Sequence, residues 1–461
     1  MNAVGALILL VVILVVLAAP RRWALMGMMA GVLYLTQGQQ LEIFGFNLYA
    51  TRFIELAGFI RVITRREFSF SRLSGLDRVF LLLYIYSTGV FLLRSSEGQV
   101  NQIGTAVDAF LCYFAFRGLV GGIEDFRWFL RAFIILLAPY TLLVLFESLT
   151  WQNPFALLEG NNFGFGDWAR EGRIRCIGSF RHPSLLGTLG ASFIPLYIGL
   201  AWAKVDRKLA FIGLGLCLLI VWASNSGGPA NCAMIGIVGW LFWPARTRMR
   251  LVRRIMVVAI ILLGMSMKAP IWYLPAKVSS LSGGDGWHRS YLMDVAFGNL
   301  DKWWVAGMPL RDTKGWFAYD LGATGGADIT NQFLYFGLTA GVASMILFFV
   351  LLYLAFRNLG KAMAILRSSS NGMHQTECLL WSLGVMLVLH MFNWLGITYF
   401  DQSYVFWFMQ LAMIANLSEG FINPVPVEAA NEIHAPLDET EDNPLAAHIQ
   451  AERPVAPMES R

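Results

Sequence analysis

Long apolar runs follow one another along most of this chain, and they limit its fold more than any other feature. A membrane-spanning helix needs roughly 20 mostly apolar residues, and inside hydrocarbon only helices and closed barrels satisfy the backbone hydrogen bonds. The runs here are continuous rather than alternating in polarity, which argues against barrel strands. Only 14% of the 461 residues are charged. We therefore predict an all-α, polytopic membrane bundle of about 12 to 13 transmembrane helices, with thirteen spans at 4–19, 23–37, 49–63, 79–93, 101–117, 126–147, 183–203, 209–223, 229–243, 255–272, 332–356, 378–397 and 403–418.

Lysine and arginine are distributed unevenly between the two sets of connections, and this predicts the orientation in the membrane. One set holds 21 basic residues, at 21–22, 61–78, 117–131, 204–208, 244–254 and 357–377. The opposite set is longer but holds 10, at 38–48, 94–100, 148–182, 224–228, 273–331 and 398–402. The first set is expected in the cytoplasm, which places the N-terminus and the large loops 148–182 and 273–331 outside and the C-terminus inside.

The end of the chain differs in composition from the rest. Residues 419–461 carry nine acidic and two basic side chains and few large apolar ones. Such a segment cannot bury enough apolar surface to fold alone. We predict a transmembrane domain over 1–418 and a disordered acidic cytoplasmic tail over 419–461. The basic residues form no cluster with interleaved aromatics, so nucleic acid is not an expected partner.

The outer loop 148–182 ends in a cluster of cationic residues directly before a span. Arg173, Arg175, Arg181 and His182 lie here, and Pro183 suits the first turn of the following helix. Arginines on the outer side run against the charge bias of the other loops. A guanidinium fork matches phosphate oxygens, and a helix N-terminus favours an anion. The cluster predicts a phosphate or pyrophosphate site, the alternative being charges that only contact lipid headgroups.

The loop 273–331 carries the other candidate site residues. His288 and Arg289 open what the pattern predicts to be a short amphipathic helix, and Asp328 and Asn331 immediately precede the next span. A carboxylate with a tuned pKa can act as a general base, and so can histidine. We therefore take Asp328 and His288 as candidate catalytic residues, and Arg289 and Asn331 as candidate substrate-binding residues.

Three further polar features have both structural and functional interpretations. Trp303 and Trp304 are expected at the membrane interface or stacked on sugar faces. The run Ser224–Pro229 is either a tight turn or a place where backbone approaches a ligand. Inside the spans, Arg52 and Glu55 are three residues apart and are expected to pair on one helix face, whereas Asp108 has no local partner.

Signals for a metal or a cofactor are absent from the sequence. The five cysteines include no Cys-x-x-Cys pair, and the six histidines lack metal-ligand spacing. Phosphate-binding loop, dinucleotide and nucleophile-elbow motifs are also missing. We predict neither a metal nor a cofactor, and these absences argue against a nucleotide-driven pump.

The order of these features resembles the O-antigen ligase / bacterial polysaccharide polymerase family. An Arg-x-x-Gly-Ser-Phe-x-x-Pro segment precedes a span, a small-residue turn follows, and a long outer loop begins with an arginine-containing helix and ends in asparagine. The resemblance covers roughly residues 75–415 and is strongest over 173–341. It implies a multi-pass protein of the bacterial inner membrane that uses undecaprenyl-pyrophosphate-linked oligosaccharide and needs no metal. Arg175 and Arg181 would match the family arginines near the donor pyrophosphate, and Arg289 the arginine of the long loop.

Two departures from the family pattern affect the expected activity. Ligases commonly have His-Asn before the late span where this chain has Thr330-Asn331, so Asp328 or His288 would supply the base. The family's Ser-Arg-Gly turn reads Ser226-Gly227-Gly228 here. Both changes favour an exopolysaccharide or O-antigen polymerase over a ligase that transfers glycan to lipid A–core.

Two alternatives from other classes are a lipid-linked oligosaccharide flippase and an assembly subunit that contacts polysaccharide export proteins through its tail. A flippase should show internal repeats and charges spread through many spans. This chain shows neither, so the sequence favours an enzyme.

Overall fold

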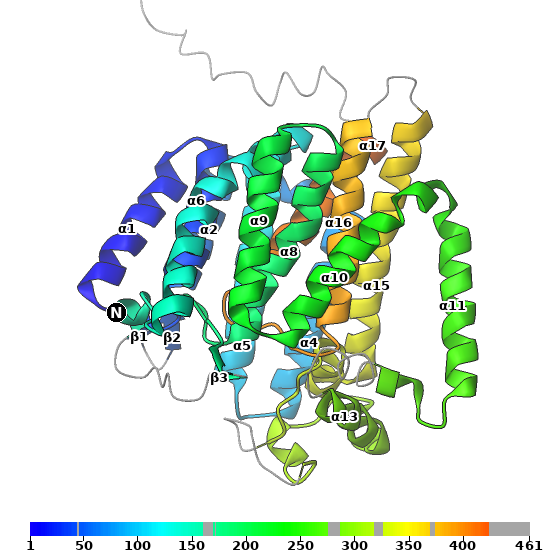
Figure 1. Cartoon of the computed structure of the whole chain (residues 1–461). Helices are drawn as coiled ribbons and strands as arrows, with labels where there is room; N and C mark the ends of the chain where they lie inside the picture. Colours follow the sequence, from blue (N-terminus) through cyan, green and yellow to red (C-terminus); the bar gives the residue numbers. More distant parts are fainter. Residues whose placement is uncertain are drawn as a thin grey trace, which may run out of the picture. The chain divides into compact units, whose positions relative to one another are not determined.

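The computed structural model describes residues 1–43, 46–159, 169–170, 172–274, 286–317, 326–368 and 374–423. Within these ranges each of the thirteen predicted spans coincides with a helix, which confirms an all-α polytopic bundle (Figure 1). The helices are α1 (Ala3–Ala18), α2 (Arg21–Tyr34), α3 (Ala50–Thr64), α4 (Gly75–Arg94), α5 (Gln99–Leu119), α6 (Ile123–Thr150), α8 (Pro183–Trp202), α9 (Arg207–Ser224), α10 (Gly227–Leu241), α11 (Met249–Ser266), α15 (Gln332–Ser368), α16 (His374–Asn393) and α17 (Ser403–Ile422).

Seven of the helices in the described ranges are long and apolar enough to cross a membrane, namely α4, α6, α8, α9, α15, α16 and α17. The predicted number of 12 to 13 therefore exceeds the number that meets this criterion. The difference arises partly from length, because α1, α2, α3 and α10 have 16, 14, 15 and 15 residues. At 1.5 Å per residue such helices are about 21–24 Å long, less than the hydrocarbon core.

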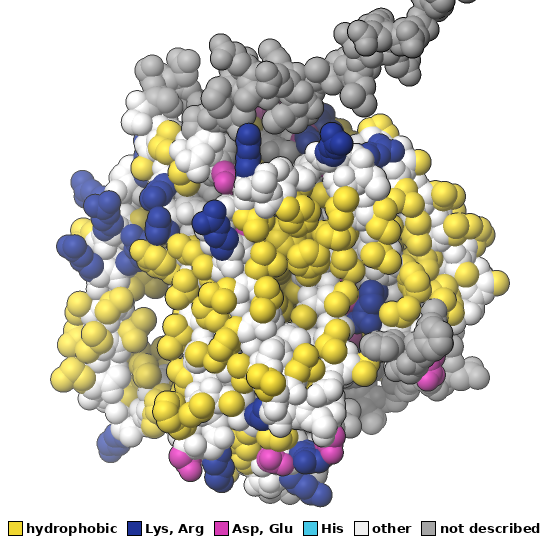
Figure 2. All heavy atoms as spheres, turned by 180° about the vertical axis from the view of Figure 1, so that it is seen from behind, with side chains coloured by type: hydrophobic (Ala, Val, Ile, Leu, Met, Phe, Trp, Pro, Cys, Tyr) yellow, Lys and Arg dark blue, Asp and Glu magenta, His cyan; other side chains and the backbone are white. Residues whose placement is uncertain are grey.

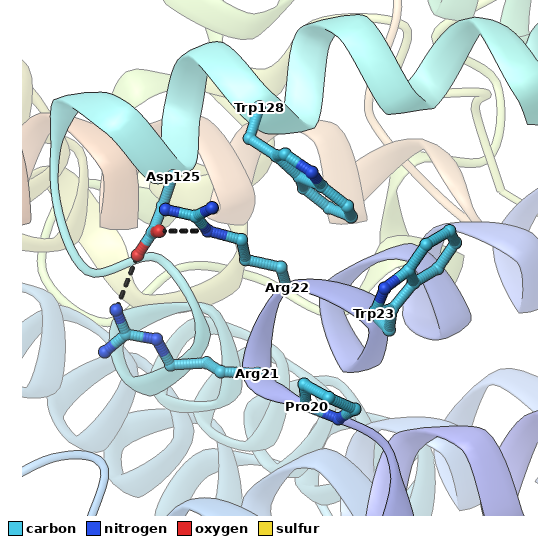
Figure 3. Close-up of a pocket in the computed structure, with 6 residues that line it drawn as sticks. All are labelled: Pro20, Arg21, Arg22, Trp23, Asp125 and Trp128. Atoms are coloured by element: carbon cyan, nitrogen blue, oxygen red, sulfur yellow. Dashed lines mark hydrogen bonds and ion pairs between the residues drawn. The ribbon is translucent and has the colours of Figure 1, made fainter.

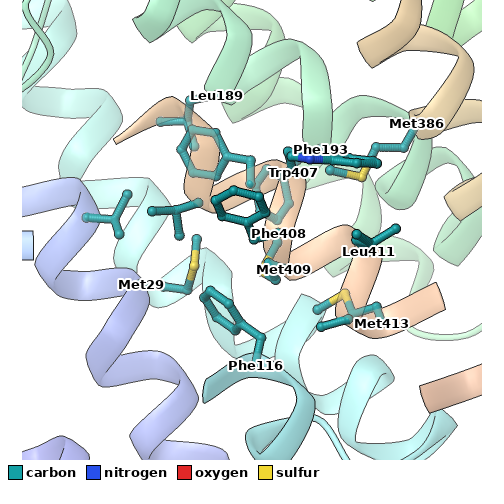
Figure 4. Packing of buried hydrophobic residues seen from close by; sticks show 14 of the residues in the cluster. Met29, Phe116, Leu189, Phe193, Met386, Trp407, Phe408, Met409, Leu411 and Met413 are labelled. Atoms are coloured by element: carbon teal, nitrogen blue, oxygen red, sulfur yellow. The ribbon is translucent and has the colours of Figure 1, made fainter. Parts of the chain in front are cut away.

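Helix α17 lies at the centre of the packing. It contacts α5, α8, α15 and α16, and most of its side chains are buried. Figure 4 shows five of its side chains among others from α2, α5, α8 and α16, namely Trp407, Phe408, Met409, Leu411 and Met413. This explains how a span of modest hydropathy is accommodated, because nearly all of its surface contacts protein rather than lipid.

The two ends of the bundle differ in character. At one end, called the loop face below, lie the hairpin of β1 (Gln40–Ile43) with β2 (Phe46–Tyr49), the short β3 (Ala169–Arg170) and β4 (Arg173–Ile174), and α13 (Trp287–Gly298) (Figure 1). The opposite end, called the basic face, holds the connections with the excess of arginine and lysine. Figure 2 shows apolar side chains in a broad band between the two ends, with lysine and arginine most concentrated above it.

Helix α11 stands apart from the bundle (Figure 1). None of its eighteen residues is buried by the described part of the chain, and its contacts are mainly with the flanking 3-10 turns η2 (Trp243–Arg248) and η3 (Ile271–Tyr273). The helix begins six residues before the predicted span 255–272, because Arg250, Arg253 and Arg254 continue the helix beyond its apolar run.

A break in α15 anchors the long loop. Gly341 has φ +84°, a left-handed conformation that favours glycine, and Gly307 in the loop has φ +73°. At the break, the Met308 amide donates to the Leu338 carbonyl at 2.8 Å, and the Val342 amide donates to the Trp304 carbonyl at 2.8 Å. The segment 304–308 is therefore joined to the helix by backbone hydrogen bonds.

The structure corrects the expectation for Trp303. This side chain is fully buried, and its indole N–H donates to the Ala296 carbonyl at 2.8 Å. It ends α14 (Leu300–Trp303) and packs between α13 and α15. Trp304 is 56% exposed, so only the second tryptophan is placed to meet lipid or ligand.

The pairing predicted inside the spans is also corrected. Arg52 forms its ion pair with Asp108 of α5, through Nε at 2.5 Å and Nη2 at 2.7 Å, rather than with Glu55. A fork-to-fork contact between two helices satisfies both oxygens of one carboxylate, which a local i to i+3 pair does less well. Asp108, for which the sequence offered no local partner, is therefore the residue that pairs with Arg52.

The end of the bundle lies slightly beyond the predicted boundary at 418. Helix α17 continues to Ile422, and Glu419 pairs with Arg117 at 3.1 Å. Arg117 also makes two hydrogen bonds with Asp77, at 2.9 and 2.7 Å, so Glu419 at the start of the acidic segment joins a buried arginine–aspartate pair. Residues 424–461 of the predicted tail lie outside the described residues.

Candidate functional site on the loop face

A pocket opens on the loop face between the first turns of α8 and α10, Arg289 of α13, and the α16–α17 connection. Its enclosed volume is small, about 30 Å³, so a ligand seated here keeps most of its own volume outside. We call it the loop-face pocket. Its lining consists of Ser184, Gly228, Pro229, Asn231, Cys232, Arg289, Phe392, Asn393, Leu395, Gly396 and Ile397.

Two helix N-termini meet at the loop-face pocket. Helix α8 begins with Pro183 in its first turn, as predicted, and α10 begins at Gly227 after the turn formed by Asn225. The hydroxyl oxygens of Ser184 and Ser226, one at each N-terminus, lie 2.8 Å apart. Because the first backbone N–H groups of a helix have no partner within it, two such ends favour an anion.

Arg175 and Arg289 add positive charge to the same place. The Arg175 Nη2 donates to the Ser226 hydroxyl at 3.5 Å, and Arg289 lies against Gly396, where a Cβ atom would come within 3.0 Å of its guanidinium. Both arginines act electrostatically on His182. Arg175, His182 and Arg289, all predicted from sequence, therefore converge, although they come from two segments more than a hundred residues apart in the chain.

His182 is held in its neutral form. Its Nδ1 accepts a hydrogen bond from the Ser184 amide at 3.1 Å, so it caps α8. Burial, together with the charges of Arg175 and Arg289, lowers the pKa of His182 to about 4. Because Nδ1 accepts this hydrogen bond, the neutral ring carries its hydrogen on Nε2, so the second ring nitrogen is a hydrogen-bond donor.

We expect His182 to contribute a pH dependence to stability. Its folded-state pKa lies below the ordinary value of 6.5, so as the pH falls the unfolded chain takes up this proton first. The contribution is complete above about pH 6.5 and is lost between pH 6.5 and about 4. His182→Asn keeps a capping acceptor and should flatten the decline in thermal stability over this window. Identical pH curves for the variant and the unmodified protein would contradict the assignment.

A buried glutamate, not singled out from the sequence, shapes the cationic segment. Glu147 near the end of α6 accepts from the Ile177 amide at 3.0 Å and from the Gly178 amide at 2.9 Å. Gly178 has φ +56°, so the chain turns sharply between Arg175 and His182. The only available signal was an acidic residue at the end of an apolar run, which has many explanations.

Asp328 and His288 lie close together at the edge of the site. Asp328 is exposed at the surface, but the protein around its carboxyl removes enough water to raise the pKa of that carboxyl, while the charge of His288 acts in the opposite direction. The His288 ring stacks on Phe317 with 4.2 Å between centroids. Thr398, next to Ile397 of the pocket lining, donates to the Ile329 carbonyl at 2.5 Å, so the backbone beside Asp328 is joined to the connection that lines the pocket.

Three other predicted residues contact groups outside the pocket lining. Arg173 lies over the Trp222 ring at 4.3 Å. Arg181 donates to the Gln37 carbonyl at 3.2 Å and lies 3.8 Å from Asp401. Asn331 is buried, and its side-chain oxygen accepts from the Phe333 and Leu334 amides at 3.0 and 3.1 Å, so it caps α15.

Residues from the last spans complete the pocket and were missed from the sequence. Asn393 donates to the Thr188 hydroxyl of α8 at 2.8 Å and to the Tyr399 hydroxyl at 3.1 Å. Gly396 provides the space for Arg289. Polar residues within an apolar span generally face the bundle interior, and this was the signal that could have identified Asn393.

Fold and site together define a polytopic helical membrane protein with a cationic pocket at one end of its bundle. Among the described residues, no group of three or more His, Cys, Asp or Glu side chains is arranged to hold a metal ion. No protein-family model matches this chain, and no curated protein matches it.

Proposed function

We propose that this protein is a glycosyltransferase that joins lipid-linked oligosaccharide repeat units into a surface polysaccharide or exopolysaccharide, at the periplasmic face of a bacterial inner membrane. One observation carries the proposal. The N-termini of α8 and α10 meet at a pocket lined by Arg289, and Arg175 lies next to it, in contact with Ser226. Such an arrangement suits a multiply charged anion better than a neutral sugar. The pyrophosphate of an undecaprenyl-linked donor is an anion of this kind.

The proposed reaction requires charge stabilisation and one proton acceptor. A hydroxyl oxygen of the acceptor glycan forms a bond to the anomeric carbon of the donor, and the bond from that carbon to the pyrophosphate oxygen breaks. Undecaprenyl pyrophosphate leaves with the electron pair, and Arg175 and Arg289 stabilise its charge. The proton passes to Asp328 or to His288 beside it. No nucleotide is needed, because the pyrophosphate is already a good leaving group.

Two considerations favour a polymerase over the alternatives. The family resemblance includes both polymerases and ligases, and Thr330 stands where ligases commonly have histidine. The candidate residues gather on one face of the bundle rather than along a path through it, which favours a surface reaction over transport of the lipid-linked glycan.

We expect Asp328→Asn to abolish polymer while the protein remains in the membrane at its usual level. The amide keeps the shape of the carboxylate but cannot accept the acceptor's proton, and loss of a general base costs roughly 10²–10⁴-fold in rate. His288→Gln is the companion variant, and the more damaging of the two identifies the base. Polymer of normal length and amount in both variants would rule out this pair.

The activity is tested by analysing lipid-linked glycans in a bacterial strain that lacks the protein. The proposal predicts single repeat units on the lipid, accessible from the periplasm, with no long polymer. Long lipid-linked polymer with none on lipid A would instead indicate a ligase. Single units confined to the cytoplasmic face would indicate a flippase and would contradict the proposal.

A further inference from the structure

A second pocket lies at the basic face, where α2 and α6 begin (Figure 3). It has a volume of about 400 Å³ and is lined by Pro20, Arg21, Arg22, Trp23, Asp125 and Trp128. We call it the Arg–Trp pocket. Nothing in the proposed glycosyl transfer uses it, because the reaction takes place at the opposite end of the bundle.

The charges of the Arg–Trp pocket are unbalanced. Arg22 Nε donates to one oxygen of Asp125 at 2.7 Å, and Arg21 Nη2 donates to the other at 2.5 Å. One carboxylate thus faces two guanidinium groups, which leaves an excess of one positive charge. Each arginine carries five N–H donors, and among the described residues each gives only one nitrogen to a hydrogen bond.

Neighbouring arginines on the same face have structural partners instead. Arg61 Nη1 donates to the Ala19 carbonyl at 2.5 Å, and Arg65 Nη2 donates to the Leu17 carbonyl at 2.7 Å. These contacts satisfy backbone carbonyl groups at the C-terminal end of α1. By contrast, the side chains of Arg21 and Arg22 are 37% and 46% exposed, so their remaining donors are accessible at the pocket.

Two tryptophans give the pocket an apolar side. Trp23 and Trp128 pack edge to face with 5.3 Å between ring centroids, and the Arg22 guanidinium lies 6.0 Å from the centre of the Trp128 ring. In Figure 3 the indoles lie on one side of Arg22 and Asp125 on the other. Tryptophan is typical of the boundary between headgroups and hydrocarbon, and α6, which carries Trp128 near its start, is long and apolar enough to span a membrane.

We infer that the Arg–Trp pocket binds the phosphate of an anionic phospholipid, with the start of the lipid's hydrocarbon against Trp23 and Trp128. A single phosphodiester charge matches the single excess positive charge. The guanidinium forks suit phosphate oxygens, and the indoles provide apolar contact that inorganic phosphate would not use. A zwitterionic headgroup fits less well, because its ammonium group would face the arginines while both oxygens of Asp125 are already bonded.

Binding can be measured by native mass spectrometry on the delipidated full-length protein. The lipids to titrate are phosphatidylglycerol and phosphatidylcholine. The wild-type protein is expected to prefer phosphatidylglycerol. The double variant Arg21→Gln/Arg22→Gln should weaken that binding roughly ten-fold or more, since each arginine near the surface contributes to the attraction of anionic lipid. The matched control is Arg66→Gln/Arg72→Gln, which removes two exposed arginines from the same face and should leave the affinity unchanged.

A variant that is expected to raise the affinity for phosphatidylglycerol provides a second test if the arginine variants fold poorly. Asp125→Asn removes the carboxylate that competes for both guanidinium groups, so phosphatidylglycerol should bind more tightly. Equal affinity for phosphatidylcholine, or equal losses in the control variant, would overturn the inference. Full displacement of phosphatidylglycerol by millimolar inorganic phosphate would also overturn it, because the site would then be a free-phosphate site and not a lipid site.

Discussion

Replacing Arg289 by glutamine is expected to abolish polymer formation while the protein stays folded in the membrane. Arg289 lines the loop-face pocket and lies against Gly396 beside the N-termini of α8 and α10. Removing a donor aimed at charge that develops during reaction typically costs roughly 10²–10³-fold in rate. The measurement is the rate at which purified protein extends a lipid-linked repeat unit.

Two variants act as controls for this result. Arg289→Lys keeps the charge but loses the fork and should recover only part of the activity. Arg311→Gln removes a loop-face arginine that is 59% exposed and paired with Glu97, so it should leave the rate unchanged. Normal activity in Arg289→Gln, or equal losses in Arg289→Gln and Arg311→Gln, would contradict the proposed role.

Replacing Gly341 by alanine is expected to cause the largest loss of stability. A Cβ atom on Gly341 would lie 2.2 Å from the Val305 carbonyl oxygen, and the residue has φ +84°. With ψ 176° as well, the backbone lies in a region that is essentially restricted to glycine and costs another residue roughly 1–3 kcal/mol, and a clash with backbone cannot be relieved by a rotamer change. We expect about 3 kcal/mol or more in total, a value reached only by disruptive substitutions. The segment 304–308 should separate from α15, which limited proteolysis would detect together with a lower melting temperature in detergent.

The same helix provides a matched control. Gly360 also lies in α15, and a Cβ atom there would meet no other atom within 4 Å. Gly360→Ala should be neutral or slightly stabilising, because glycine in a helix interior costs roughly 0.5–1 kcal/mol relative to alanine. Equal melting temperatures for Gly341→Ala and Gly360→Ala would contradict the proposed attachment of segment 304–308 to α15 at the break.

The helices could be predicted well from the sequence, because a long continuous apolar run by itself indicates a membrane-spanning helix. All thirteen spans coincide with helices in the described part of the chain, and the largest shift of bounds is that of α15, which continues to Ser368, twelve residues beyond its predicted end. Helix α16 ends at Asn393, four residues before its predicted end, where the chain turns to line the loop-face pocket. Hydrophobicity alone could not indicate that Leu395 and Ile397 lie beside a polar site instead of continuing the span.

Contacts between distant segments were beyond the reach of local patterns. Arg52 was expected to pair with a residue three positions away, but its partner is 56 residues away on another helix. In the site, Arg175, His182 and Arg289 were each selected, yet nothing in the sequence showed that they converge while Arg181 contacts other groups. Asn331 was selected for its position before a span, and that position is the reason it serves as a helix cap.

The central claim is that the loop-face pocket binds the pyrophosphate of the donor, and direct binding tests it. The measurement is the affinity of undecaprenyl pyrophosphate, without any sugar, for the purified full-length protein, its Arg175→Gln/Arg289→Gln variant and its Arg311→Gln control. The account predicts saturable binding that is lost in the double variant and retained in the control. Equal affinity in all three proteins would contradict it.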